Sequence, residues 1–506
     1  MLVKFFKMSV LLLCLLPGIL LAEETDLPSP YDITATDLFS GLYIGAQLGM
    51  VNWLAVESNS ATLISTGGSL HFPPINNQAI DFNAAGGFHI GYGWELARYY
   101  LGDELYVTYQ SNAAKNNLGG RVNNSSLNAQ ISIKTQTELG SDLRAGILLT
   151  PNVMFFIYTG ILGNWVSVGA ELNGQTPTGL LTATENKQKV LPGVRLGFGV
   201  EARPAERIGF GVRYYRTLVL GNFTAYPRST PDANGSFVSD ETNGSKFSTQ
   251  GFLAFLSYYL GGPFVETPAM TYILTDNFNG FFLGIHSGVS HAKFKGNVNT
   301  SSSSTIANSS TGSSKGGDGN AGIIGGVHLG YGQHWGRYYF GIAAHSTVGN
   351  ASSTALVSMV PLGLANQTSL NTSTILKIGD QPGVDLKPGI LLGSNVLLFT
   401  RVGVGVTHIR LQTTANHTIT INNDSDSFSV TSLKYLIGLR TGFGLEMMLN
   451  RNFSFTMGYL YVHYYNSLAH EQTRVRGDPL NNISNNTTVL ITTQSFLFGL
   501  NYYTKY

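Results

Sequence analysis

The sequence predicts an all-β protein made of antiparallel transmembrane β-barrels, arranged as two tandem eight-stranded barrels. Three observations lead to this fold class: a shortage of charge, an internal duplication, and a strict alternation of apolar and polar residues. Only 12% of the 506 residues are charged, about half of the ~25% that soluble domains carry. Beyond residue 22 no apolar run is long enough for a membrane helix, so a closed barrel is the structure that would satisfy its backbone in lipid.

The first 22 residues have the layout of a cleavable secretory signal. Lys4 and Lys7 precede an apolar run over 10–21, and the small residue Ala22 follows that run. The run is shorter than the ~20 residues of a spanning helix, which argues against a membrane anchor. We therefore expect residues 1–22 to be a signal peptide.

The only cysteine, Cys14, lies inside that segment. Leu13 precedes it, where a lipoprotein signal requires a small residue, so lipidation is disfavoured. Removal of the signal would leave a chain without cysteine, which excludes disulfides and metal–thiolate sites. Residues 23–40 are expected to form a periplasmic leader.

The chain repeats itself. Residues 36–41 (TDLFSG) match 275–280 (TDNFNG), at an offset of 275 − 36 = 239. The same offset aligns 86–93 (GGFHIGYG) with 325–332 (GGVHLGYG). Small changes of offset fall between the expected strands, where loops absorb insertions. A duplicated domain is the simplest explanation.

Within each copy the side-chain pattern has a period of two, which is typical of strands with unlike faces. In the first expected strand Leu42, Ile44 and Leu48 fall on one face, whereas Tyr43 and Gln47 fall on the other. We expect eight strands per copy, at 41–55, 80–94, 97–112, 129–149, 152–170, 187–203, 206–221 and 247–260, and at 280–292, 321–333, 336–350, 373–392, 395–411, 432–448, 451–466 and 488–505.

These strands define a first barrel unit at 41–260, a periplasmic linker at 261–279 and a second barrel unit at 280–506. The length of the linker favours two closed barrels, and one sixteen-stranded barrel with a wider lumen is the alternative. Short turns alternate with longer connectors rich in Asn, Ser, Thr and Gly, as expected for periplasmic turns and external loops. The longer connectors of the first copy are 56–79, 113–128, 171–186 and 222–246.

Strand parity predicts where the charges lie. The lipid-facing positions carry essentially one charge, Asp103, and the other strand charges face inward. Arg195 and Arg440 are expected to pair across strands, for example with Asp142 and Asp385. The network either plugs or gates the lumen, or simply fills a narrow barrel. Its predicted members are His89, Arg98, Asp142, Arg144, Arg195, Glu201, His328, Arg337, Asp385, Lys387, Arg401, Arg440 and Glu446.

Several segments carry a family resemblance: the opening strand 41–49 (GLYIGAQLG), the element 385–389 (DLKPG), the strands 395–399 and 442–446, and a C-terminal aromatic residue, Tyr506. In these segments each copy resembles the opacity-type, OmpA-like family of outer-membrane barrels. The resemblance covers nearly all of the chain after the signal peptide, once in each copy. It implies a location in the bacterial outer membrane, with lipid, lipopolysaccharide and the barrel assembly machinery as partners.

The sequence favours a structural or adhesive protein whose surface loops meet a host or cell-surface ligand. A passive porin-like channel for small solutes is the alternative, and an enzyme acting on lipid A, with His89 or His328 as base, is a third hypothesis. We expect no enzyme activity, because no serine or carboxylate recurs beside these histidines in a repeated pattern. We assign no catalytic, cofactor-binding or metal-binding residue. A net charge of +1 gives no support for nucleic-acid binding.

Overall fold

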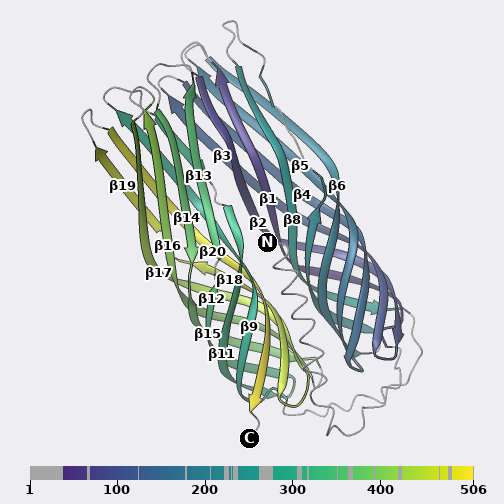
Figure 1. Ribbon diagram of the computed structural model, residues 1–506. Coiled ribbons are helices and arrows are strands. Elements are labelled where there is room, and N and C mark those ends of the chain that lie inside the picture. The colour runs from purple at the N-terminus through teal and green to yellow at the C-terminus, as the bar shows by residue number, and fades with distance from the viewer. Residues whose placement is uncertain are drawn as a thin grey trace.

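The computed structural model contains two β-barrel units that lie side by side (Figure 1). It describes residues 38–64, 69–122, 125–176, 179–205, 207–221, 227–229, 231, 237–260, 277–304, 310–315, 318–349, 351–362, 368–392, 395–419, 424–465, 468–476 and 481–504. The predicted signal peptide, most of the leader and most of the linker lie outside these residues. No helix in the described part of the chain is long and apolar enough to cross a membrane.

Eight antiparallel strands form the first unit. Each strand pairs with the next, and the ring closes where β8 pairs with β1, with Tyr43 opposite Tyr259 and Ile64 opposite Phe237. The strands are β1 (Gly41–Ile64), β2 (Ser69–Leu96), β3 (Tyr99–Val122), β4 (Ser125–Thr150), β5 (Val153–Thr176), β6 (Gly179–Ala205), β7 (Ile208–Val219) and β8 (Phe237–Tyr259).

The second unit closes separately, because β20 pairs with β9 from Thr504 opposite Phe281 onward. Its ring runs through β9 (Gly280–Ser304), β11 (Asp318–Trp335), β12 (Tyr338–Gly349), β15 (Gln381–Leu391), β16 (Val396–Ile419), β17 (Asp424–Met448), β18 (Phe453–Tyr464) and β20 (Asn481–Thr504). Shorter strands extend this ring away from the turns: β10 (Ser310–Lys315), β13 (Ser352–Leu362), β14 (Thr368–Ile378) and β19 (Leu468–Arg476).

This pairing confirms the predicted fold class of two tandem eight-stranded antiparallel transmembrane barrels. The sixteen-stranded alternative is wrong, because it would require β8 to pair with β9 and β20 to pair with β1. Each of these strands instead pairs within its own unit. A narrow ring of eight strands leaves an interior just wide enough for side chains.

The strands are longer than predicted. The connectors expected at 56–79, 113–128 and 171–186 are mostly hydrogen-bonded strand, and only a few residues separate β1 from β2, β3 from β4, and β5 from β6. The backbone of these segments pairs with neighbouring strands despite its polar composition. Composition alone therefore underestimates how far a hairpin continues.

An apolar belt surrounds the barrels next to their short turns. On β3 it extends from Tyr99 to Tyr109, over 109 − 99 + 1 = 11 residues, and large apolar side chains face outward along it. This length matches the ~10 residues that a tilted strand needs to cross a bilayer. Trp94 and Trp335 lie at the turn end of the belt, where amphipathic rings favour a membrane interface. Asp103 is exposed on the outside, as predicted, and accepts a 3.1 Å hydrogen bond from Ser141 Oγ.

The polarity of the barrel wall reverses above the belt, and β4 shows how. Near the turn, Leu143 faces outward and Asp142 faces inward; farther along, Ile131 and Ile133 face inward and Lys134 faces outward. A β-bulge between Thr135 and Glu138 separates the two stretches. One extra residue shifts the register, so the same alternation presents its apolar residues to lipid below the bulge and to the interior above it.

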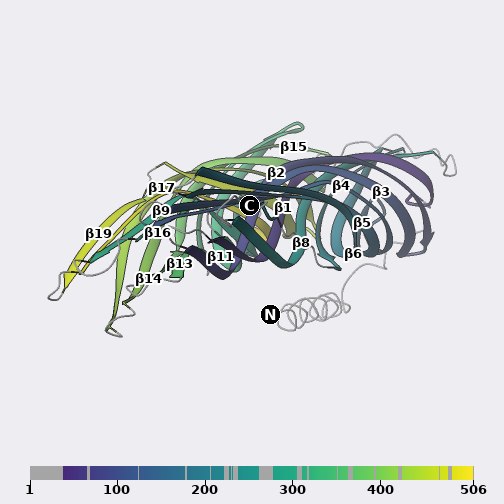
Figure 2. The same cartoon turned by 90° about the horizontal axis from the view of Figure 1, so that it is seen from above.

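The two units also contact each other. Aromatic side chains on their outer walls pack together, with the rings of Phe198 and Phe498 4.9 Å apart and those of Tyr214 and Phe496 5.3 Å apart. Away from the turns, β3 pairs with β10 and β2 pairs with β13, which joins all 20 strands into one hydrogen-bonded sheet. Seen from above, β3 to β6 lie at one side of the molecule and β14, β17 and β19 at the other (Figure 2).

Candidate functional site

The candidate site is the pair of lumens, where the inward-facing charges gather. In the first barrel Arg144 is the centre of a buried network. Its guanidinium bonds Glu104 at 3.1 Å and Glu201 at 2.8 Å, and it donates to the Tyr43 hydroxyl at 2.9 Å. Its face lies 4.0 Å from the ring centre of Phe156. The arginine therefore links carboxylates from β3 and β6 across the lumen.

Two further arginines complete this layer. Arg213 bonds Glu104 at 2.5 Å. Arg195 lies 3.4 Å from both Glu138 and Asp142, so its predicted pairing with Asp142 is confirmed. All these side chains are at most 1% exposed. Burial of charge is tolerable here because each group has an opposite charge or hydrogen-bond partner.

Apolar layers close the first lumen on both sides of the charges. Next to the turns lies an aromatic layer that includes Phe39, Tyr43, Tyr100, Phe156 and Tyr259. On the other side a second layer includes Ile131, Ile133 and Val166, together with Trp53 and Phe247, whose rings stack 5.4 Å apart. The inward position of Tyr43 follows from the predicted strand parity, but the aliphatic layer with Ile131, Ile133 and Val166 was not predicted.

Glycines make room for the large side chains inside both barrels. A Cβ atom at Gly45 would overlap the His89 ring, and one at Gly284 would overlap the His328 ring. The positions are equivalent in the two copies, since each glycine lies on the first strand of its barrel and each histidine on the second. Close cross-strand approach of this kind explains part of the chain's 60 glycines.

The second lumen holds fewer charges. Arg440 bonds Asp385 at 3.0 Å, which confirms that predicted pair. Lys387 contacts Glu446, which also accepts hydrogen bonds from Asn501 at 2.6 Å and Tyr503 at 2.8 Å. Both carboxylates are thus already engaged by neighbouring side chains.

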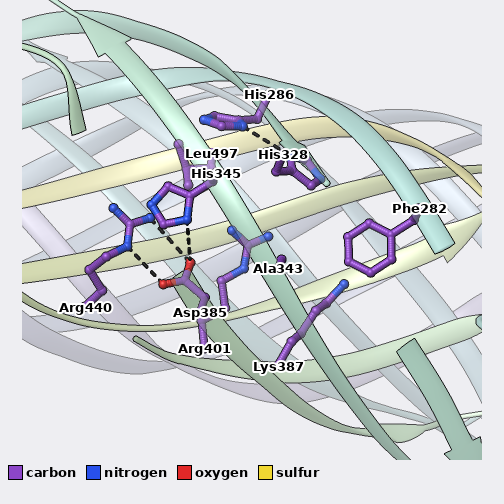
Figure 3. A pocket seen from close by; sticks show the side chains of 10 residues that line it. All are labelled: Phe282, His286, His328, Ala343, His345, Asp385, Lys387, Arg401, Arg440 and Leu497. Carbon is purple, nitrogen blue, oxygen red and sulfur yellow. Dashed lines mark hydrogen bonds and ion pairs between the residues drawn. The ribbon is translucent and has the colours of Figure 1, made fainter. Parts of the chain in front are cut away.

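A pocket remains in this lumen (Figure 3) and encloses about 440 Å³ of empty space, open solvent included. Three histidines reach it. His286 Nδ1 lies 3.3 Å from His328 Nδ1, and His345 Nδ1 lies 3.6 Å from Asp385 Oδ2. Arg401 also lines the pocket and lies over the Phe399 ring at 5.1 Å. Among the described residues no group of three or more His, Cys, Asp or Glu is arranged to hold a metal ion.

The structure places most of the predicted network inside the barrels, but Arg98 and Arg337 are corrections. Both are exposed and occupy two-residue turns, between β2 and β3 and between β11 and β12. Strand parity does not continue through a turn, so an inward assignment for them had no basis. Their backbone carbonyls instead accept bonds from Leu148 and Leu391, each at 2.8 Å. The predicted residues found inside are His89, Asp142, Arg144, Arg195, Glu201, His328, Asp385, Lys387, Arg401, Arg440 and Glu446.

Sequence reasoning missed some lumen groups. Glu138 and His345 were not predicted, although Glu138 has the inward parity of the predicted Asp142 on β4, and His345 of β12 pairs directly with the predicted His328 of β11. Parity counted from those neighbours would have found both. Asn501, which bridges Glu446 and His328, was also missed, because it is uncharged and the predicted network consisted of charged residues and histidines.

No family model and no curated protein matches the sequence. Among solved structures the chain is similar to a FadL homologue of Pseudomonas aeruginosa, at 11% identity over 91% of this chain and 90% of that chain, with a TM-score of 0.24. It is also similar to the outer-membrane protein OprG of the same species, at 15% identity over 45% and 99%, with a TM-score of 0.25. A third is the attachment invasion locus protein Ail of Yersinia pestis, at 9% identity over 40% and 98%, with a TM-score of 0.14.

Proposed function

We propose that the protein is a bacterial outer-membrane protein of the opacity-type, OmpA-like class, with a structural or adhesive role at the cell surface and no enzyme activity. The observation that supports this proposal is that the first lumen is closed, whereas the strands of its barrel continue well beyond the apolar belt. The charged layer of the first barrel is buried between apolar layers. Meanwhile β3 continues from Tyr109 to Val122, 122 − 109 = 13 residues past the belt, about 40 Å of strand at ~3.3 Å per residue.

Strands that extend this far beyond the membrane would offer a ligand a large surface, whose backbone is held by hydrogen bonds between neighbouring strands. On β6 the corresponding stretch carries the exposed Lys187 and Lys189, and polar residues above an apolar belt suit contact with lipopolysaccharide or with a host or neighbouring cell. Insertion would require the barrel assembly machinery, as for other outer-membrane barrels. A passive channel is the alternative that the pocket in the second lumen favours, whereas in the first lumen the charged layer is buried between apolar layers.

Shortening one hairpin tests the surface role. Val56 pairs with Gln78, so replacing residues 57–77 by Asn-Gly keeps the register of the remaining strands. We expect bacteria that display this variant to bind cell monolayers and matrix proteins less than bacteria that display the intact chain, with equal amounts of folded barrel. An Ala97→Gly variant, changed at the opposite end, is the matched control and should bind as the parent does.

Planar-bilayer recording separates this proposal from the channel alternative. The purified full-length protein is expected to give no steady conductance, because the charged layer of the first lumen is buried between apolar layers and the pocket in the second lumen has room for about one water-sized group. Stable, reproducible open levels would support a channel, and unchanged adhesion of the shortened variant would refute the surface role.

A further inference from the structure

The two lumens can be compared residue by residue, because the strand registers of the two units coincide. Gly91 pairs with Glu104 in the first barrel, and Gly330 pairs with Ala343 in the second. Both pairs are related by the repeat offset of 239, since 330 − 91 = 239 and 343 − 104 = 239. Equivalent positions can therefore be compared directly, and a different residue there means different chemistry at the same place in the two lumens.

The second copy has lost carboxylates. Ala343 replaces Glu104, the residue on which Arg144 and Arg213 converge in the first barrel. Gln381 replaces Glu138, as the pairs Thr108 with Glu138 and Thr347 with Gln381 show.

The second copy has also gained basic and donor groups. Arg401 replaces Tyr158, since these residues pair with the equivalent glycines Gly442 and Gly197. His345 replaces Tyr106 and His286 replaces Gln47, by the same comparison of registers.

These exchanges reverse the formal charge of the layer when histidine is counted as neutral. The first lumen has Arg144, Arg195 and Arg213 against Glu104, Glu138, Asp142 and Glu201, or 3 − 4 = −1. The second has Lys387, Arg401 and Arg440 against Asp385 and Glu446, or 3 − 2 = +1. Small residues also open space, because Gly458 stands where the first copy has Arg213.

Arg401 is the cation that remains without a carboxylate. Within the described chain it forms no ion pair, and its contact is the ring of Phe399. The two nearby carboxylates are engaged by Arg440 and Lys387. Figure 3 shows the Arg401 guanidinium between the Asp385 cluster and Lys387, with no dashed line to it. A partly buried guanidinium whose N–H groups bond no carboxylate among the described residues is a strong site for a negative charge.

We propose that the second barrel binds a small inorganic anion in this pocket, with Arg401 as the principal ligand and His345, whose ring nitrogens have no hydrogen-bond partner in the described part of the chain, as a neutral donor beside it. The free space has room for about one water-sized group, which suits a halide better than a larger oxyanion. This site is independent of the proposed surface role, since it lies in the lumen and involves none of the projecting hairpin.

Halide binding can be measured by nuclear magnetic resonance. The purified full-length protein in detergent is titrated with sodium bromide at constant ionic strength, with gluconate as the balancing anion, and the broadening of the bromide signal reports binding. Arg401→Tyr restores the residue of the first copy and removes the charge. Ala343→Glu keeps every cation but adds the carboxylate that the first copy has. Arg451→Gln, at an exposed turn, is the control for loss of one positive charge.

We expect saturable broadening with the parent protein and with Arg451→Gln, and at least tenfold weaker binding in Arg401→Tyr and Ala343→Glu. Folding of every variant is checked by its heat-dependent shift in gel mobility. If Arg401→Tyr does not fold, Ala343→Glu decides the question. Absence of saturable broadening with the folded parent would overturn the proposal, and so would equal broadening in Ala343→Glu. Neither result would bear on adhesion.

Discussion

At the scale of single residues, Arg144 bonds two buried carboxylates that come from different strands. It bonds Glu104 and Glu201 together, so its removal leaves the buried Glu201 without its cation and leaves Glu104 with Arg213 alone. We expect Arg144→Ala to lower the free energy of unfolding by about 3–5 kcal/mol, the usual cost of breaking a buried pair from one side. Urea titration of the protein in lipid vesicles measures this change.

Arg98→Ala provides the comparison for that experiment. Arg98 is exposed in a turn, and a surface substitution of this kind changes stability by about 0.5 kcal/mol or less. Equal effects of the two substitutions would contradict the buried network. Arg144→Lys should fall between them, since the equivalent Lys387 holds one carboxylate rather than two.

A second residue-scale prediction concerns the turn between β2 and β3. Ala97 has φ of 55°, in the left-handed region, whereas the equivalent position in the second copy is Gly336 with φ of 61°. Left-handed backbone costs a residue with a Cβ about 1–2 kcal/mol, offset in part by the smaller entropy of its unfolded chain. Ala97→Gly should therefore raise stability, and Gly336→Ala should lower it, each by about 1 kcal/mol. Shifts in the urea midpoint of the same sign would refute this.

Parity and the repeat together located most of the lumen charges from the sequence, because a bilayer penalises a charge on the outer face so heavily that the pattern is strict. The same reasoning gave the pairs of Arg195 and Arg440. It could not predict that Arg144, rather than Arg195, holds Glu201, since partners across a barrel depend on register between strands distant in sequence. Nor could it show that Arg401 lacks a carboxylate.

At the scale of elements, the bulge in β4 sets which residues face inward. Deleting Gln136 would leave β4 without its extra residue, so Ile131 and Ile133 would turn toward water, or else the charged residues below would turn toward lipid. We expect this deletion to abolish folding, measured as the yield of heat-modifiable barrel. Gln136→Ala keeps the residue count and should fold normally; a normal yield from the deletion would show that the bulge is dispensable.

Predicted strands were correct near the turns and too short at the other end. Near the turns lipid forces apolar residues outward, so the alternation is visible in sequence. Farther along, the outer face meets water and the inner face is apolar, and Asn, Ser, Thr and Gly on β1 to β6 resemble loop composition. Backbone pairing over this length is a tertiary property that composition does not reveal.

At the scale of the whole molecule, aromatic packing holds the outer walls of the two barrels together. Phe252 and Phe496 stack with ring centres 5.9 Å apart, and His291 Nε2 lies 3.2 Å from Gln250 Oε1 across the same contact. In a double-mutant cycle of Phe252→Ala and Phe496→Ala, we expect a coupling energy of about 0.5–1.5 kcal/mol in unfolding free energy. Strictly additive effects would mean that the barrels do not touch there.

The repeat predicted two units, but no local pattern could decide whether they close separately. Both arrangements use the same sixteen transmembrane strands and the same inward parity. The choice depends on one pairing, that of β8 with β1 rather than with β9. Separate closure gives narrow, filled lumens, whereas a single ring would enclose a wide aqueous space.

Engineered disulfides test that closure most directly, because Cys14 is the only native cysteine and lies in the predicted signal. Leu48 pairs with Ala254 across the seam of the first barrel, and Ile285 pairs with Leu500 across the seam of the second. Cysteine pairs at both seams should oxidise to disulfides in the folded protein, identified by mass spectrometry, while an Ala46→Cys, Leu500→Cys pair should stay reduced; Ala46 is the first-copy equivalent of Ile285, since 285 − 239 = 46, and would face Leu500 in a single ring. Oxidation of that last pair, with the first two remaining as thiols, would contradict two separate barrels.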